Sequence, residues 1–457
     1  MASDRHPAIG RLYHHLGILE RPSLRKLCLY SKSLTCVIPF PNARDSLATL
    51  CGPIVQDEQM IQSSSQSPEA RIVTFHALVH SQYEQGVIDS VGSHALELLS
   101  ENLSKLRDFG AYLAITNTSA LFELGAPTNS LFHQYTTAIN QAMQKSRPSA
   151  SHSNLGNLIS TGISSSSACN RTLESGKKFW IDTFELVLQK YSRASLNDSL
   201  SFMHCILVCL HSLHSLRTRL SNGQHNHTYQ APFDTALLPW NALANYLNTL
   251  VQQHPIDDRI EECARQGVFL TPAGKEDARP LPEDYLIRGL VWGQFYFRPG
   301  WFDGQGEDDG RAIETHHTHK AREERVLWLG LYLALHTQHL SYDVQRQVFS
   351  ASTTISVPSP ERIPAAFHPA AMDPAEFSTE RATATPSPNN TRSSLAPSSR
   401  SDSEDGFHIV KAPRSSKSTT TPQECSWAKM ASDEHGTSPP RKHRRSDNRN
   451  VVVAGAD

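Results

Sequence analysis

The chain has 457 residues, with 43 Lys and Arg against 45 Asp and Glu, so its formal net charge is -2. This balance excludes a global basic field that would recruit nucleic acid, and any such surface must be local. Apolar residues make up 38% of the chain, which is low for a wholly folded protein. The composition therefore predicts long polar segments beside an ordinary core.

The eight cysteines include no CxxC pair and no dense spacing pattern. Since several of them lie in apolar, helix-like stretches, we expect reduced, buried thiols and a reducing compartment. The N-terminal sequence MASDRHPAIG is polar, and no apolar run approaches the ~20 residues that a membrane span needs. We expect a soluble, intracellular protein with no membrane partner.

Short amphipathic helices are predicted through the N-terminal third of the chain. Apolar residues recur there at helical spacing, and prolines separate the first helices. We expect Asn42 to cap the third of them. The helices predicted here are Pro7–Leu19, Ser23–Val37, 43–50, Glu69–Gln82, Asp89–Phe122 with a kink near Gly110, and Thr128–Lys145.

The middle of the chain begins with a segment rich in Ser, Gly and Asn, about residues 146–171, which predicts a disordered insertion. Helical patterns resume after it. One of them contains FMHCILVCLHSLHSL, which is apolar all round and therefore predicts a buried helix. The helices predicted here are Thr172–Tyr191, Asn197–Leu220, Pro239–Val251 and Asp257–Ala264.

The segment Arg279–Phe302, RPLPEDYLIRGLVWGQFYFRPGWF, is predicted to contain a helix that starts at Pro282, a favourable first position. We expect the run 298–300, Arg-Pro-Gly, to end that helix. A second helix is predicted over Lys320–His336, and its second half is apolar all round. Together the two helices predict a helical hairpin that closes the folded core.

From Ala351 the composition changes to Ser, Thr, Pro and Ala, which predicts a disordered tail over residues 351–457. No segment combines β-branched alternation with a hairpin turn. The predicted fold class is therefore all-α, an α-α superhelix of stacked, tetratricopeptide-like helical hairpins over residues 1–350.

Three blocks of sequence resemble one family. They are GRLYHHLGILERPSLRKLCLYSKSLTCVIPFPNARDSL (Gly10–Leu47), PWNALANYLNTL (Pro239–Leu250) and RPLPEDYLIRGLVWGQFYFRPGWF with ERVLWLG (Arg279–Gly330). In this order they resemble the DNA/RNA-binding helical domain of the ever-shorter-telomeres family of telomerase-associated proteins. That family includes the SMG adaptors of nonsense-mediated mRNA decay, and the fungal members look most similar.

The resemblance implies a non-enzymatic scaffold in nonsense-mediated mRNA decay, with RNA or DNA binding. The alternative is a telomerase-associated subunit in telomere maintenance. The implied partners are an RNA helicase and other decay factors, or telomerase RNA and telomeric single-stranded DNA. Nine residues precede the first block, so we expect no counterpart in this sequence for the helices that hold the family's phosphoserine pocket, and no pocket residue is carried over. Nothing after Ala351 predicts the nuclease domain of some members.

A local basic surface is predicted on the second helix. Basic side chains there could contact phosphates, and the rings of Tyr13 and Tyr30 could stack on single-stranded bases. The alternative, which the overall charge favours, is a solvated helix face with both rings in the core. The predicted nucleic-acid-binding residues are Arg21, Arg25, Lys26 and Lys32.

Two histidine-containing patterns are candidates for a metal-binding site. The first comprises residues of one apolar helix, for which core packing is the favoured interpretation: His204, Cys205, Cys209, His211 and His214. The second sets three histidines near an acidic run, where a solvated loop is favoured: His316, His317 and His319 beside Glu307, Asp308 and Asp309. We therefore expect no metal, no cofactor and no catalytic residue.

A compact basic cluster lies in the predicted tail and fits a nuclear localisation signal. It predicts a nuclear protein that could shuttle to the cytoplasm, and the run SDSED at residues 401–405 resembles an acidic kinase substrate. The residues of the cluster are Arg441, Lys442, Arg444 and Arg445.

Overall fold

The computed structural model describes residues 2–145, 167–192, 195–221, 229–271, 279–303 and 316–352, all within the unit Met1–Ile363. This part of the chain is mostly helical, as predicted, and ends in a small hairpin. Its elements, in chain order, are α1 Ala2–Arg5, α2 Gly10–Leu19, α3 Leu24–Thr35, α4 Ala43–Gln56, α5 Glu58–Gln62, α6 Pro68–His80, α7 Gln85–Glu101, η1 Leu103–Lys105, α8 Leu106–Leu121, α9 Ser130–Lys145, α10 Ser167–Lys190, α11 Leu196–Ser221, η2 Thr235–Leu237, α12 Trp240–Gln253, α13 Asp258–Gln266, α14 Pro282–Ile287, α15 His316–His336, β1 Leu340–Asp343 and β2 Val348–Ala351.

Side-chain caps start several of these helices where the sequence places a short polar residue. The Ser23 hydroxyl accepts from the backbone N–H of Lys26 at the start of α3, and the Asp257 carboxylate accepts from that of Ile260 at the start of α13. Each cap satisfies one of the N–H groups that a helix leaves unpaired in its first turn. Asn42, the expected cap of α4, makes no such hydrogen bond with its side chain.

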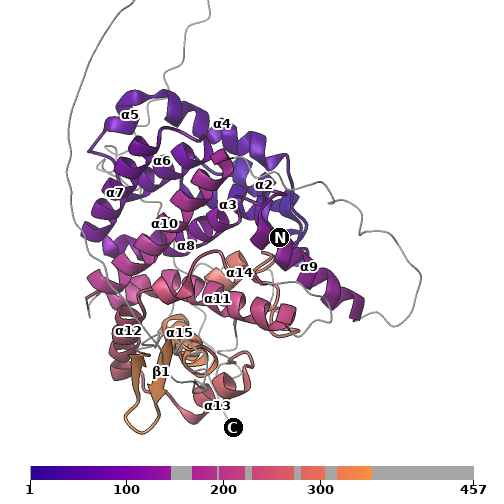
Figure 1. Ribbon diagram of the computed structural model, residues 1–457, viewed down its shortest axis with the longest axis vertical. Coiled ribbons are helices and arrows are strands. Elements are labelled where there is room, and N and C mark those ends of the chain that lie inside the picture. Colours follow the sequence, from indigo (N-terminus) through magenta and orange to yellow (C-terminus); the bar gives the residue numbers. More distant parts are fainter. Residues whose placement is uncertain are drawn as a thin grey trace, which may run out of the picture. The chain divides into compact units, whose positions relative to one another are not determined.

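The helices pack in two rows. The first row is α2, α3, α8, α11 and α15, and the second is α4, α6, α7, α10 and α12, each helix packing against the next in its row. The rows meet where α3 contacts α4 and α6, α10 contacts α8, and α12 contacts α15. Figure 1 shows α4 and α5 at the top of the described part and α13 and β1 at the bottom, with α8, α10 and α11 between them.

Helix α11 lies at the centre of this packing and touches helices of both rows. It is long and apolar enough to cross a membrane by length and composition, but 83% of the apolar window is buried inside the fold. Leu200, Ile206 and Leu216 are fully buried, although they lie on different sides of the helix. The prediction of a buried helix is confirmed, because α11 is surrounded by other helices.

Two predictions about helix boundaries are wrong. The break in the long helical zone after Asp89 lies at Asn102–Lys105, while Gly110 lies inside α8 and faces α11. The helix that starts at Pro282 ends at Ile287, ten residues before the expected end. Gly289 has φ +85°, and a Cβ there would lie 1.8 Å from the Pro7 carbonyl oxygen, so the chain leaves the helix to meet the N-terminal segment.

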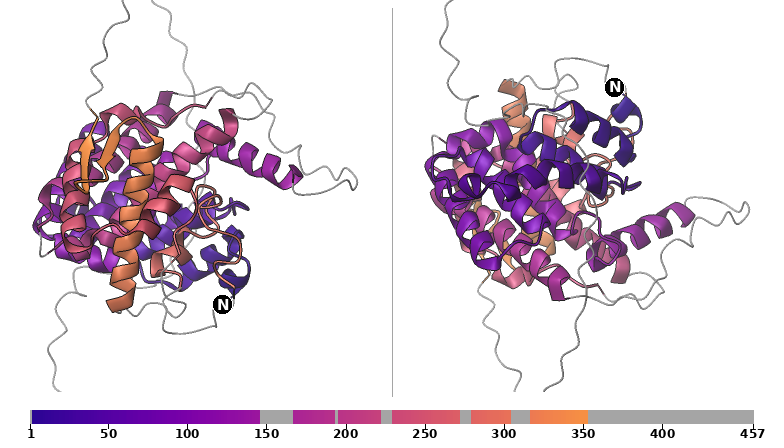
Figure 2. Two further views of the ribbon diagram at one scale, coloured as in Figure 1. Left: turned by 90° about the horizontal axis from the view of Figure 1, so that it is seen from below. Right: turned by 90° about the horizontal axis from the view of Figure 1, so that it is seen from above.

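An antiparallel β-hairpin follows α15, although the sequence reading found no hairpin. Strand β1 pairs with β2, with Leu340 opposite Ala351 and Asp343 opposite Val348. Figure 2 shows the two strands beside α15. The inward residues Leu340 and Phe349 are buried, so these short strands are held by packing on α12 and α15 more than by their own pattern.

The predicted limits of the two polar segments differ from the structure at their edges. Residues 167–171, assigned to the insertion, are helical and form the start of α10. Ala351, assigned to the tail, is the last residue of β2. Residues 146–166 and 353–457 lie outside the described part, so disorder there stays a prediction.

Candidate functional site

The predicted basic surface is only partly present. Arg21 is exposed, and the Arg25 side chain is 56% exposed while its Nε lies 3.1 Å from a Glu20 carboxylate oxygen. Lys26 is partly exposed and donates from Nζ to the Glu20 carbonyl at 3.0 Å. These three cations lie close together near the start of α3. Glu20 offsets part of their charge.

Lys32 does not belong to this surface, and the prediction that it faces outward is wrong. Its side chain is fully buried and donates from Nζ to the carbonyl oxygens of Tyr285 and Leu286, at 2.9 and 2.7 Å. Tyr13 and Tyr30 are buried as well, which agrees with the alternative that placed both rings in the core. Burial lowers the pKa of Lys32 to about 8, so the side chain is mainly a cation at neutral pH.

Lys32 was misplaced because its partners lie more than 250 residues away in the sequence. Residues 35–37 run beside residues 289–291: the Val37 N–H donates to the Gly289 carbonyl, and the Val291 N–H donates to the Thr35 carbonyl, both at 3.0 Å. The short helix α14 ends at this point and leaves two carbonyls without helical partners. A buried ammonium is a suitable donor to such a pair.

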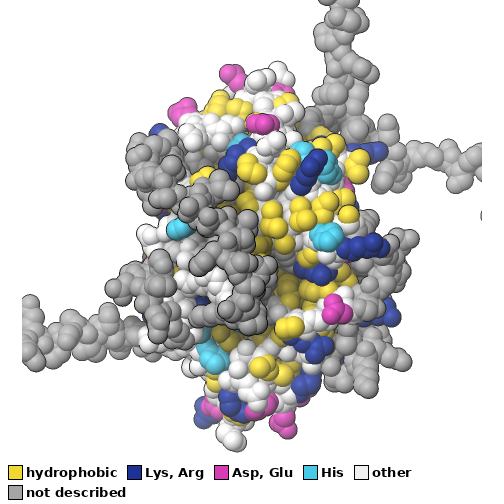
Figure 3. Space-filling view, turned by 90° about the vertical axis from the view of Figure 1, so that its right-hand side faces the viewer, with side chains coloured by type: hydrophobic (Ala, Val, Ile, Leu, Met, Phe, Trp, Pro, Cys, Tyr) yellow, Lys and Arg dark blue, Asp and Glu magenta, His cyan; other side chains and the backbone are white. Residues whose placement is uncertain are grey.

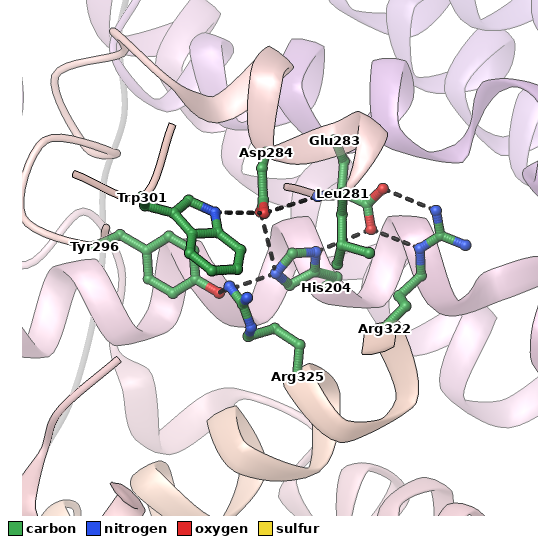
Figure 4. Close-up of polar contacts among 8 residues, drawn as sticks. All are labelled: His204, Leu281, Glu283, Asp284, Tyr296, Trp301, Arg322 and Arg325. Carbon is green, nitrogen blue, oxygen red and sulfur yellow. Dashed lines mark hydrogen bonds and ion pairs between the residues drawn. The ribbon is translucent and has the colours of Figure 1, made fainter. Parts of the chain in front are cut away.

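A buried ionic network joins α11, α14 and α15 (Figure 4). The Glu283 carboxylate accepts from Arg322 Nε at 2.6 Å and Nη2 at 2.9 Å, which is a two-point pair. His204 lies between them and a tyrosine: its Nδ1 is 3.0 Å from Glu283 Oε1 and its Nε2 is 3.0 Å from the Tyr296 hydroxyl. These polar groups are at most 4% exposed.

A second carboxylate completes the network. Asp284 accepts from the backbone N–H of Leu281 at 3.0 Å and from Trp301 Nε1 at 3.3 Å. Arg325 donates to the Tyr296 hydroxyl at 3.1 Å, and its guanidinium lies 4.0 Å from the centroid of the Phe269 ring. The Asp284 carboxylate thus turns back onto the start of its own helix.

The charges of this network are set by their neighbours. Burial by itself would raise the pKa of Glu283, but the Arg322 guanidinium and the hydrogen bond with His204 hold that pKa well below its usual range. Burial would lower the pKa of Arg325, whereas Tyr296 and Asp284 raise it. Since these groups are enclosed, the arrangement holds three helices in register and offers no open position for a substrate.

Cys205, Cys209, His204 and His211 of α11 pack in the core, as the favoured interpretation predicted, whereas His214 is only partly buried, with its Nδ1 2.9 Å from the Tyr332 hydroxyl oxygen. Cys205 and Cys209 are each 1% exposed, and His204 belongs to the ionic network. His211 packs between aromatic rings, with ring centroids 4.3 Å from Tyr332 and 5.7 Å from Trp328. Within the described residues no three His, Cys, Asp or Glu side chains are grouped to hold a metal ion.

A band of polar residues on α8 is the feature that the sequence reading missed. The run Thr116–Ser119 is buried at the centre of the fold. Asn117 pairs with His76 at 2.9 Å, Thr118 accepts from Trp180 Nε1 at 3.2 Å, and Ser119 lies 3.3 Å from Thr35 Oγ1. The sequence AITNTSAL already indicates this band, because four consecutive polar residues interrupt an otherwise apolar helix there.

A small cavity of about 60 Å³ lies beside this band. Helices α3, α4, α6, α8 and α10 and the turn after α8 supply its walls. The lining residues are Leu27, Ser31, Leu47, His76, Val79, His80, Thr116, Ala120, Glu123, Leu124 and Thr172.

Two further sequence predictions fall outside the described residues. The basic cluster Arg441, Lys442, Arg444 and Arg445 lies there, as do the acidic partners proposed for the 316–319 histidines. Those histidines begin α15.

No model of a known protein family matches the chain, and no curated protein matches it.

Proposed function

We propose that this protein is a non-enzymatic helical scaffold in nonsense-mediated mRNA decay, of the ever-shorter-telomeres and SMG type. Its finer architecture in this proposal is a tetratricopeptide-like α-α superhelix. One observation carries the proposal: the three blocks that resemble the family pack against one another although they are far apart in the sequence. The Lys32 ammonium of the first block binds carbonyls of the third, and α12 of the second block packs against α15.

Several residues of these blocks pack the helices against one another. In this proposal the blocks therefore specify the fold. Gly10 lies so close to α3 that a Cβ would be 2.2 Å from the Ser33 carbonyl oxygen. Tyr13 covers the Lys32 ammonium, and Glu283 of the RPLPED motif binds Arg322. A chain with these residues is expected to adopt the same arrangement of helices around α11.

The two-row packing supports the superhelical architecture. Four helices, α8, α10, α11 and α12, alternate between the rows in chain order, as successive units of a helical repeat do, although α9 lies between the first two and belongs to neither row. The first helices depart from this alternation, because α4, α6 and α7 all belong to the second row. The proposal therefore predicts degenerate repeats that are most regular between α8 and α12.

The surface combines exposed hydrophobic and cationic side chains, a combination that is suited to binding a partner. The face in Figure 3 gathers hydrophobic side chains among Lys, Arg and His, with Asp and Glu mainly toward its two ends. Leu19 at the end of α2 is 83% exposed and lies two residues before Arg21, the first residue of the basic group of Arg21, Arg25 and Lys26. Phosphate contacts from these cations would give RNA affinity that falls as salt rises.

Equilibrium binding of the full chain to single-stranded RNA, measured at several salt concentrations, tests the nucleic-acid part of the proposal. Neutralising the basic group with Arg21→Gln, Arg25→Gln and Lys26→Gln should weaken binding and reduce the magnitude of the salt slope by up to about 2, since each of three phosphate contacts contributes about 0.7 on a single strand. The matched control neutralises three exposed cations on other elements: Lys178→Gln, Arg265→Gln and Arg346→Gln. Equal losses in both variants would refute a localised surface.

Affinity purification of the tagged chain from its own cells tests the pathway. Co-purification of an RNA helicase with decay factors would support the scaffold role in mRNA decay. Enrichment of telomerase RNA would favour the alternative, a telomerase-associated subunit. Recovery of neither class would contradict the functional proposal and leave only the helical architecture.

A further inference from the structure

The cavity beside α8 contains two buried hydroxyl groups without partners. Ser31 is fully buried and its hydroxyl oxygen has no hydrogen-bond partner among the described residues, while Thr116 is 1% exposed and its hydroxyl has no oxygen or nitrogen partner there. Thr116 lies beside the Cys28 thiol, which is a weak hydrogen-bonding group. A buried hydroxyl without a partner costs about 1–3 kcal/mol, so a pair facing one cavity is unusual in a native core.

The rest of the polar band shows that Thr116 is an exception. Asn117, Thr118 and Ser119 each have a partner on a neighbouring helix, on α6, α10 and α3 respectively. Thr116 belongs to the same run, and it faces the cavity. The hydroxyl that lacks a protein partner is therefore the one with free space in front of it.

The turn that forms part of the cavity wall has a strained backbone. Glu123 has φ 47° and Leu124 has φ 52°, a left-handed conformation that costs a non-glycine residue roughly 1–2 kcal/mol. Arg44 holds the turn by donating to the Leu124 carbonyl at 3.0 Å, and Asn129 donates to the Glu123 carboxylate at 2.9 Å. Strain that neighbours maintain in this way is typical of binding sites.

The cavity wall is mainly apolar and carries little net charge. Leu27, Leu47 and Val79 supply the apolar part. The Glu123 carboxylate at the wall is offset by the nearby Arg44 guanidinium, and burial lowers the pKa of His76 to about 4, so that imidazole is neutral at pH 7. A charged ligand would lose its hydration without gaining a counter-ion.

We propose that this cavity is a binding site for a small neutral ligand with a short alkyl body and one hydroxyl head group, which hydrogen-bonds to Ser31 and Thr116. The volume of about 60 Å³ corresponds to roughly four waters and admits a ligand of about three or four heavy atoms. The alkyl body contacts the three aliphatic side chains, and the head group supplies the donor and the acceptor that the two hydroxyls lack. This site is independent of the proposed scaffold function.

Titration of the methyl-labelled full chain with 2-propanol, followed by NMR, tests the site. We expect saturable shifts confined to the methyl groups of Leu27, Leu47, Val79 and Leu124, with millimolar affinity. Ser31→Ala combined with Thr116→Val removes both hydroxyls, nearly preserves the shape, and should weaken binding at least tenfold. The double variant should be as stable as the parent, because it removes groups that have no partner.

Ser33→Ala is the matched control. Ser33 is fully buried on the same helix and its hydroxyl also lacks a partner among the described residues, but it does not line the cavity. This variant should bind 2-propanol like the parent. Shifts that rise linearly and spread over the surface, or equal affinity in the double variant, would overturn the proposal. Either result would mean that the cavity holds water only.

Discussion

The Lys32 ammonium lies over the Tyr13 ring, 4.0 Å from its centroid, and donates to the carbonyls of Tyr285 and Leu286 at the end of α14. One side of the cation thus meets the negative face of an aromatic ring and the other meets two carbonyl oxygens. This relationship joins α2, α3 and α14, which come from both ends of the described chain. It accounts for a fully buried lysine in the core of the protein.

Replacing Lys32 should therefore destabilise the fold strongly. Lys32→Met keeps the aliphatic stem but leaves the carbonyls of Tyr285 and Leu286 without their donor. We expect the free energy of unfolding to fall by about 3 kcal/mol, since each unpaired buried group costs about 1–3 kcal/mol. Urea denaturation measures the change. Arg25→Met, at an exposed position of the same helix, should cost less than about 0.5 kcal/mol, and equal effects would contradict the assignment.

The pair of Glu283 and Arg322 should show a large coupling energy. Glu283→Gln preserves the shape but leaves the buried guanidinium without a counter-ion, which should cost about 3–5 kcal/mol. Arg322→Met alone should cost a similar amount. The double variant should be more stable than the sum of the single losses predicts, because neither charge is then left unpaired.

Lys178 and Asp182 provide the comparison for this double-mutant cycle. They form an ion pair on α10 in which the Lys178 side chain is 69% exposed. The coupling energy between them should be below about 0.5 kcal/mol. If the coupling energy between Glu283 and Arg322 is equally small, the buried network does not hold α14 against α15.

Stability should fall as the solution becomes acidic below about pH 6.5. Burial lowers the pKa of His76 to about 4 and that of His211 to about 3, whereas both have a pKa near 6.5 in the unfolded chain. Between these values the unfolded state binds more protons, so the free energy of unfolding decreases as pH falls. Each histidine contributes up to about 1.4 kcal/mol per pH unit.

His211→Phe isolates one of these contributions. The ring keeps its contacts with Tyr332 and Trp328, and the lost Nδ1 has no partner among the described residues. The slope of the free energy of unfolding against pH, measured between pH 6 and pH 5, should decrease by nearly the contribution of one bound proton, which is about 1.4 kcal/mol per pH unit. An unchanged slope would show that His211 is not held neutral by burial.

The glycine at position 289 should not tolerate alanine. Its φ is +85°, and the added Cβ would meet the Pro7 carbonyl. We expect Gly289→Ala to cost more than about 2 kcal/mol, because the backbone strain and the clash both oppose it. Gly86→Ala is the control: nothing lies within 4 Å of a Cβ there, so helix propensity should change stability by at most about 1 kcal/mol in the favourable direction. Thermal unfolding distinguishes the two outcomes.

The sequence by itself determined the helical class and most helix positions. The period of apolar residues specifies which face of α12 is buried, and short polar residues such as Ser23 and Asp257 specify where a helix starts. The uniformly apolar stretch of α11 likewise predicted its central place. These features depend on neighbours within a few residues, so a linear reading contains them.

Only the tertiary structure decided which polar residues are functional candidates and which are part of the core. Lys32 has the same local surroundings as an exposed lysine, but carbonyls more than 250 residues away bury it. Glu283 and Thr116 are similar cases. Glu283 is buried because Arg322 on α15 pairs with it, and Thr116 is buried beside a cavity between helices. A buried polar group is stabilised by partners from distant segments, and helical spacing carries no information about those partners.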